Sequence, residues 1–243
     1  MKDFQTLIVE WLEAQLGLYQ QAIEKRKGDY LKKKWPWTES AVSDFNRRIE
    51  NLTALHASVL SELTFGKVYG EDLLNLANLI FNEAGTANRS AKVAIAYAWL
   101  NRTKGVMREP KNAAEVSYYI PLVERWNGLT DIDRLTFLQN FAICLSAARQ
   151  RLGDGEATKN DPTQGSTHWV SPISLPGFKG GKGSYQRTVG KAVNRAFPTW
   201  ARSNSDPELA KMKKNNQVQP TYLELSVVGV DQASFLFYKG VNY

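Results

Sequence analysis

The chain has 243 residues, 43% of them hydrophobic, so it is long enough to bury one sizeable core. Its formal net charge of +7 favours acidic partners: nucleic acid, an anionic membrane surface or the acidic polymers of a bacterial wall. A single cysteine, Cys144, excludes an internal disulfide, and its phase with neighbouring apolar residues predicts a buried structural thiol. With only two histidines we expect no metal and no cofactor, although a cation site built from carboxylates stays open.

The first 66 residues predict a helical hairpin. Apolar residues recur at helical spacing over residues 4–23, and a second helix, capped by Thr38, carries a heptad-like apolar seam that includes His56. We interpret His56 as a partly buried structural histidine. The basic run from Lys25 to Lys34 fits contact with phosphates or, more commonly, a solvated linker. The WPW sequence beside it fits a sugar-stacking or partner-binding patch, or packing against the hairpin.

No targeting or membrane-spanning segment is expected. The apolar start of the chain is interrupted by Glu10 and Glu13, well short of the core of a signal peptide. No run approaches the ~18 apolar residues of a membrane span. A protein that acts outside the cytoplasm would then need another route of export.

Three helices are expected after Gly70. The first covers residues 71–84 and stops near Gly85, a residue suited to the left-handed position that follows a helix. The second, from about Ser90, is apolar almost all round, which is typical of a central core helix. The third begins at Thr130, with Asp133 three residues on as a near capping box.

The C-terminal third differs from the preceding helices in its sequence pattern. Residues 153–185 show no helical or strand periodicity but contain several aromatic side chains, which favours a functional loop over disorder. A last helix is expected over residues 186–202. The sequences TYLELSVVGV and SFLFY then predict two strands joined by a tight turn at Asp231 and Gln232, a small C-terminal β-hairpin.

One carboxylate interrupts an apolar stripe. Leu76, Leu79 and Ile80 recur at helical spacing, and the next position of the series is Glu83. Burial against the stripe and the negative end of the helix dipole would both raise the pKa of Glu83. A carboxyl group that keeps its proton near neutral pH can act as a general acid. The alternative is that the helix ends one residue early and Glu83 faces water or caps a neighbouring amide.

Five short motifs occur in one order over residues 73–238. They are LIFNEAG, AIAYAWLNR ending at Arg102, DPTQGSTH over residues 161–168, PTWA from Pro198, and the pair Phe237–Tyr238. In this order they resemble the bacterial cell wall hydrolases of the SleB/CwlJ type, the spore-cortex-lytic group. The resemblance implies that residues 67–243 form a mainly α, lysozyme-like α+β domain that cleaves peptidoglycan glycan strands.

The resemblance also implies a catalytic role for Glu83. The glutamate of the first family motif is the catalytic acid, and members often act as lytic transglycosylases, in which one carboxyl group serves as acid and then as base. The chain departs from the family pattern in two places: GTAN follows Ala84 where a second acid is usual, and Phe235 stands where a histidine is usual. Both departures disfavour hydrolysis with two carboxylates and leave a lytic transglycosylase or one-acid muramidase.

The loop of the third motif supplies the expected groove wall. Asp161 fits contact with a sugar or, with better support, the turn expected before a proline. Aromatic rings there fit stacking on sugar or anchoring of the loop. The predicted substrate-binding residues are Asp161, Thr163, Thr167, His168, Trp169 and Tyr185.

Two other functions remain open at this point. A basic helical protein that binds nucleic acid would explain the positive charge, and a catalytically inactive module would bind the wall without cleaving it. Under the leading hypothesis the partners are glycan strands, with neither nucleic acid nor a membrane span. The expected enzyme is made in the cytoplasm and acts at the cell wall or periplasm. A phage-type route, or a secretion carrier for an antibacterial toxin with a cognate immunity protein, would deliver it.

Overall fold

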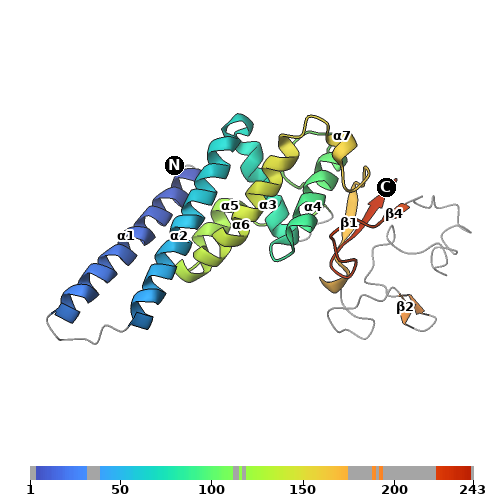
Figure 1. Cartoon of the computed structure of the whole chain (residues 1–243). Coiled ribbons are helices and arrows are strands. Elements are labelled where there is room, and N and C mark those ends of the chain that lie inside the picture. Colours follow the sequence, from blue (N-terminus) through green and yellow to red (C-terminus); the bar gives the residue numbers. More distant parts are fainter. Residues whose placement is uncertain are drawn as a thin grey trace, which may run out of the picture.

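The structure is a computed structural model, and it describes residues 4–31, 39–111, 115–116, 119–174, 188–189, 192–193 and 223–241. The described part is mainly helical, with a small three-stranded antiparallel sheet at one end (Figure 1). The helices are α1 (Phe4–Leu31), α2 (Glu39–Phe65), α3 (Glu71–Ala84), α4 (Arg89–Arg102), α5 (Leu122–Asn127), α6 (Asp131–Leu152) and α7 (Ala157–Asn160). Two 3₁₀ segments are η1 (Gly66–Tyr69) and η2 (Pro172–Ser174).

The N-terminal hairpin is present as predicted. Helices α1 and α2 lie side by side and extend away from the rest of the molecule (Figure 1). Helix α1 continues to Leu31, so the expected linker was wrong for the part of the basic run that is described. His56 is half-buried, with its Nε2 atom 4.0 Å from the Glu13 Oε1 atom of α1, which fits the structural interpretation. Thr38 and the WPW sequence lie outside the described residues.

The hairpin shares its hydrophobic core with the helices that follow it. The ring of Phe4 packs edge-on against Trp126 of α5 and Phe141 of α6, with centroids 5.7 Å and 6.2 Å apart. Trp11 donates its indole N–H to the Asp131 carboxylate at 3.0 Å. Because one core spans residue 66, removing the hairpin would expose aromatic rings of α5 and α6 to water. A functional boundary at that residue stays a prediction.

The capping signal read from the sequence at Thr130 is confirmed, and α4, expected from about Ser90, begins after a cap at Asn88. The Asn88 side chain accepts a hydrogen bond from the Ala91 N–H at the start of α4, at 2.9 Å. At the start of α6 the Thr130 hydroxyl oxygen accepts from the Asp133 N–H at 3.3 Å. Such caps satisfy N–H groups that have no partner within the helix, and they mark where each helix begins.

Helix α4 packs against both α3 and α6 and is a core helix, as its composition predicted. Every residue from Ala91 to Leu100 is buried. On the facing side of α6, Cys144 is completely buried, and burial raises the pKa of its thiol to about 12. Cys144 is therefore the structural thiol that was expected rather than a nucleophile.

Gly85 follows α3 directly, but the expected left-handed conformation was wrong. Its φ and ψ angles are −52° and −41°, in the right-handed region that any residue can adopt. A Cβ atom at this position would lie 2.8 Å from the carbonyl oxygen of Phe81. Close backbone approach, not dihedral freedom, is therefore what favours glycine here.

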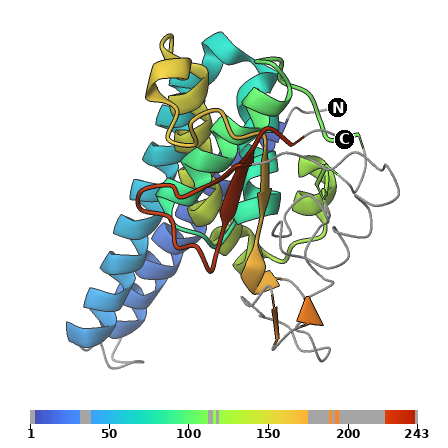
Figure 2. The same cartoon turned by 90° about the vertical axis from the view of Figure 1, so that its right-hand side faces the viewer.

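The three-stranded sheet has the order β1-β5-β4 and lies against α4, in front of the helices in Figure 2. Strand β5 (Leu236–Lys239) pairs antiparallel with β4 (Leu223–Leu225), which confirms the predicted C-terminal strands. The connection between them covers residues 226–235 and is longer than the tight turn expected at Asp231 and Gln232. The third strand, β1 (His168–Val170), places His168 opposite Tyr238.

Two expectations for the C-terminal third were wrong. The segment expected to lack regular structure contains α7, β1 and η2 within residues 153–174. Where a last helix was expected, β2 (Thr188–Val189) and β3 (Ala192–Val193) form an antiparallel pair, and the rest of residues 186–202 lies outside the described residues. Across the described ranges, no helix is both long and apolar enough to cross a membrane.

Candidate functional site

Glu83 is the penultimate residue of α3, in the last turn where the sequence placed it. Its side chain is half-buried, and its Oε2 atom accepts a hydrogen bond of 2.6 Å from the indole N–H of Trp169. Trp169 lies on β1, 86 residues further along the chain. Pairing of β1 with β5 holds that strand against α4, so the sheet brings the indole to the end of α3.

The carboxyl group of Glu83 has a raised pKa, as its place in the apolar stripe predicted. Burial is the largest cause, because desolvation disfavours the charged form. The hydrogen bond from Trp169 and the positive charge of Arg102 lower the pKa, but they do not offset the effect of burial. The structure therefore favours a Glu83 that keeps its proton to higher pH than an exposed glutamate.

The partner of Glu83 also orients its proton. An indole N–H can only donate, so Oε2 acts as the acceptor in this pair. The carbonyl-type oxygen of a neutral carboxyl group is the better acceptor, which leaves the acidic proton on Oε1. The contact thus directs the acidic O–H away from Trp169.

Lys92 clamps the end of α3 from inside the core. Its side chain is completely buried, and its Nζ atom donates to the carbonyl oxygens of Ala84, Gly85 and Ala87 at 2.9, 2.8 and 2.6 Å. The Ala84 oxygen also accepts from the Ala87 N–H at 3.0 Å, and a cation at a helix C-terminus is favourable. The turn that carries Glu83 is therefore fixed by an ammonium group from α4.

Sequence reasoning overlooked Lys92. The signal available was one cation among ten residues of an otherwise apolar helix. Burial lowers the pKa of its ammonium group, because desolvation disfavours the charged form. Hydrogen bonds to three carbonyl oxygens offset part of that cost.

Asp161 forms the turn at the start of the DPTQGSTH loop. Its Oδ1 atom accepts from the backbone N–H and the hydroxyl of Thr163, at 2.7 and 2.6 Å. Its Oδ2 atom accepts from Gly165 N–H at 2.7 Å and from the Asn101 side-chain amide at 2.8 Å. Four hydrogen bonds occupy the carboxylate, so Asp161 has the turn-forming role rather than the sugar contact that the sequence also allowed.

Other predicted substrate-binding residues are used inside the fold. Thr163 and His168 are buried, so a substrate cannot reach them in this conformation, although direct contact was expected. The Thr167 hydroxyl lies 2.8 Å from the His168 Nδ1 atom. Burial, followed by the charge of Arg102, lowers the pKa of His168 to about 4, so its ring is neutral at pH 7.

Trp169 differs from the expected sugar-stacking platform. Only 9% of its surface is exposed, so its faces are packed in the protein, and its function at the site is to donate to Glu83. Tyr185 lies outside the described residues.

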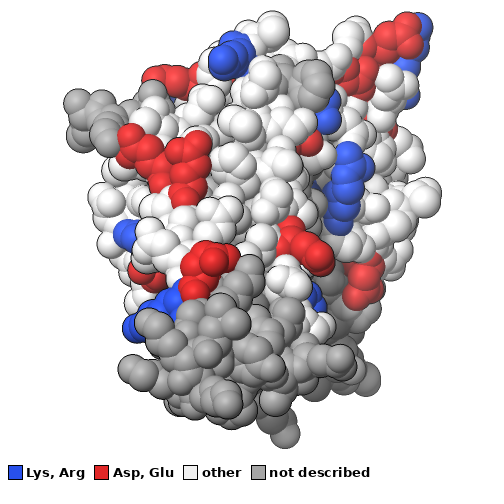
Figure 3. Space-filling view, turned by 60° about the vertical axis from the view of Figure 1, so that its left-hand side comes forward, with Lys and Arg blue, Asp and Glu red and all other residues white. Residues whose placement is uncertain are grey.

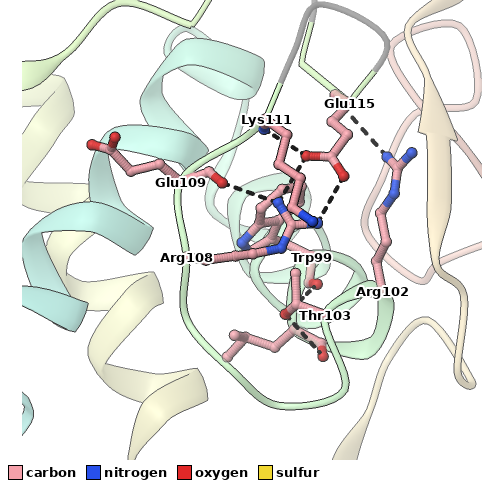
Figure 4. Close-up of polar contacts among 8 residues, drawn as sticks. Trp99, Arg102, Thr103, Arg108, Glu109, Lys111 and Glu115 are labelled. Carbon is pink, nitrogen blue, oxygen red and sulfur yellow. Dashed lines mark hydrogen bonds and ion pairs between the residues drawn. The ribbon is translucent and has the colours of Figure 1, made fainter.

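A charged network lies next to the C-terminal end of α4 (Figure 4). Arg108 binds both carboxylate oxygens of Glu115 at 2.7 and 2.8 Å, which lowers the pKa of Glu115 to about 2. Arg102 donates to the backbone carbonyl of Glu115 at 3.5 Å. The positive charge of Arg102 also lowers the pKa values of Glu83 and His168. Among the described residues, Arg102 is the only charged one identified as shifting the pKa of Glu83.

The part of the chain that the structure describes contains no cluster of side chains suited to bind a metal ion. No group of three or more His, Cys, Asp or Glu side chains there could hold an ion. Glu83 is accompanied by an indole and a guanidinium, both of which are donors only. This arrangement suits proton transfer by a single carboxyl group.

No family model, curated protein or solved structure matches this chain.

Proposed function

We propose that this chain cleaves the glycan strands of peptidoglycan as a lytic transglycosylase, with Glu83 as general acid and then general base. The observation that carries the proposal is a half-buried carboxyl group with a raised pKa, oriented by an indole donor at the end of a clamped helix. A general acid must hold its proton at the working pH and release it in the transition state. The family resemblance of the motif around Glu83 supplies the substrate class.

The reaction needs one carboxyl group and no water. Glu83 donates its proton to the glycosidic oxygen as the bond from that oxygen to muramic acid C1 breaks. The positive charge that develops at C1 is quenched by attack of the 6-hydroxyl oxygen of the same sugar. The Glu83 carboxylate takes the hydroxyl proton, so a 1,6-anhydro ring closes and the enzyme returns to its starting protonation state.

Two features favour this scheme over hydrolysis by a carboxylate pair. The sequence GTAN, residues 85–88, follows Ala84, so the second acid of the family motif is missing. The charge that shifts the pKa of Glu83 belongs to Arg102, which can serve neither as a nucleophile nor as a base. A one-acid muramidase, in which water replaces the 6-hydroxyl group, is the neighbouring alternative.

We also propose that this domain has a lysozyme-like fold. A mainly helical frame with a small antiparallel sheet beside the acid is the coarse arrangement that a lysozyme-like α+β domain requires. The nucleic-acid alternative has less support. On the face shown in Figure 3, Lys and Arg side chains are interspersed with Asp and Glu rather than gathered into one basic patch.

Analysis of digested sacculi tests the proposed function. Purified protein is incubated with sacculi, and the soluble fragments are identified by mass spectrometry. We expect 1,6-anhydro muropeptides, each lighter by one water than the corresponding hydrolysis product. Fragments with reducing ends would assign a muramidase instead. If no fragments are released while duplex DNA is bound with steep salt dependence, the wall-cleaving function is wrong.

Replacing Trp169 by phenylalanine tests the orienting contact. The variant keeps a buried ring but loses the donor, so turnover should fall by roughly tenfold, the value of one hydrogen bond. Because the bond from Trp169 lowers the pKa of Glu83, its loss should move the alkaline limb of the pH–rate profile to higher pH. Trp11→Phe is the matched control, since it removes an indole donor from the Asp131 carboxylate far along the chain. Equal profiles for Trp169→Phe and the control would contradict the orienting role.

A further inference from the structure

Arg125 is held in place by two uncharged groups of α3. Its Nη2 atom donates to the side-chain oxygen of Asn82, and its guanidinium carbon lies 5.0 Å from the centre of the Phe81 ring. Phe81 and Asn82 directly precede Glu83 in the chain. The position of this cation is therefore tied to the same helical turn as the proposed catalytic acid.

Asn82 is itself fixed, so it presents its oxygen to Arg125. Its side-chain nitrogen donates to the backbone and side-chain oxygens of Asn78 at 2.7 and 3.1 Å. Its oxygen also accepts from the Ile120 N–H at 3.0 Å. These bonds set the amide orientation, and together with the aromatic ring they restrict the guanidinium before any ligand arrives.

The charge of Arg125 is not neutralised by an acidic side chain of the described part. Within the described ranges no carboxylate forms an ion pair with Arg125, and its buried Nε atom makes no hydrogen bond. Among the other half-buried arginines, Arg108 binds Glu115, Arg134 binds Asp131 and Arg149 binds Glu62, whereas Arg151, stacked on Tyr97, also has a buried Nε without a hydrogen bond. Burial makes the charge of Arg125 costly and lowers its pKa.

We propose that Arg125, held by the two residues that precede Glu83, is a binding site for a carboxylate of the substrate. A guanidinium that is oriented by neutral partners retains its full charge and its preference for planar, two-oxygen anions. This inference rests on the proposed function, because peptidoglycan supplies such groups. The carboxylate comes either from the peptide stem or, in stripped strands, from the lactyl group of muramic acid.

A binding measurement in the Glu83→Gln background tests the site without requiring cleavage. Affinity is measured for intact glycan strands and for strands stripped of peptide, each with free carboxylates or with the carboxylates converted to amides. We expect the single variant to bind free-carboxylate strands about tenfold more tightly than amidated strands, the value of one charge-assisted hydrogen bond. Adding Arg125→Gln should abolish that difference. The strand type that shows the difference identifies the source of the carboxylate.

Two further variants separate binding from folding. Arg125→Lys keeps the charge but not the planar fork, so it should retain part of the preference for free carboxylates. Arg134→Gln is the matched control, because that guanidinium also stacks on an aromatic ring, Trp126 at 4.9 Å, but is neutralised by Asp131. It should leave the preference unchanged.

The outcomes distinguish this site from the proposed function. If the wild-type chain releases anhydro products while Arg125→Gln leaves the carboxylate preference intact, the binding site is wrong and the function stands. If Arg125→Gln weakens binding to free and amidated strands equally, Arg125 has a structural role only, and the site is again overturned. If no strand is bound and none is cleaved, both proposals fail.

Discussion

Replacing Glu83 by glutamine is expected to abolish cleavage of glycan strands and to leave the fold intact. Glutamine keeps the shape of the side chain and an oxygen that can accept the hydrogen bond from Trp169, but it has no acidic proton to give. A general acid contributes typically ~10²–10⁴-fold in rate, and here the same group must also act as the base. The loss of muropeptide release should therefore reach at least that range.

The same substitution should change how stability depends on pH. Because folding raises the pKa of Glu83, the folded protein binds this proton more tightly than the unfolded chain does. The stabilisation is complete below the unfolded pKa, and it is lost as pH rises through the window up to the folded pKa. Relative to the wild type, the glutamine variant should therefore gain stability through that window and be neutral or more stable at pH 7.

Melting curves and muropeptide release are measured on the same preparations across this pH range. Glu71→Gln is a matched control, because it makes the same change at the exposed start of the same helix. Near wild-type release by Glu83→Gln would show that Glu83 is not the acid. An inactive but strongly destabilised variant would show that the carboxylate is ionised and structurally paired.

Replacing Lys92 by methionine is expected to cause the largest loss of stability. Methionine fills a similar apolar volume but removes the ammonium donor from the carbonyl oxygens of Ala84, Gly85 and Ala87, of which Ala84 keeps its bond from the Ala87 N–H. A buried acceptor left unsatisfied costs about 1–3 kcal/mol. Since Gly85 and Ala87 lose this donor, the free energy of unfolding should fall by about 2 kcal/mol or more.

Chemical denaturation of Lys92→Met, with Lys159→Met as control, measures this loss. Lys159 is exposed and pairs only with Glu156 at the surface, so its substitution should change the free energy of unfolding by less than about 0.5 kcal/mol. In whatever fraction of Lys92→Met remains folded, cleavage should also decline, because the turn that carries Glu83 is released. A Lys92→Met protein as stable as its control would show that the ammonium group does not hold the end of α3.

Local patterns determined where the helices lie and where the acid sits. The bounds of α3 and the caps of α4 and α6 follow from periodicity, Asn88 and Thr130, signals that operate within one or two turns of chain. These signals act locally because neighbours three or four residues apart already make such contacts in the helix. The phase of Glu83 in an apolar stripe predicted its raised pKa, but the burial that raises the pKa requires the stripe to pack against other elements.

The partners of the acid were decided by packing between distant segments. Strand β1 has three residues, too few for a periodic pattern, and it exists because it pairs with β5 near the C-terminus. That pairing delivers the indole of Trp169 to Glu83 and buries the ring that was expected to stack on sugar. Likewise, the stacking of Arg125 on Phe81 and its hydrogen bond to Asn82 join groups some 43 residues apart. Such pairs depend on how helices and strands meet in three dimensions, so residue spacing cannot reveal them.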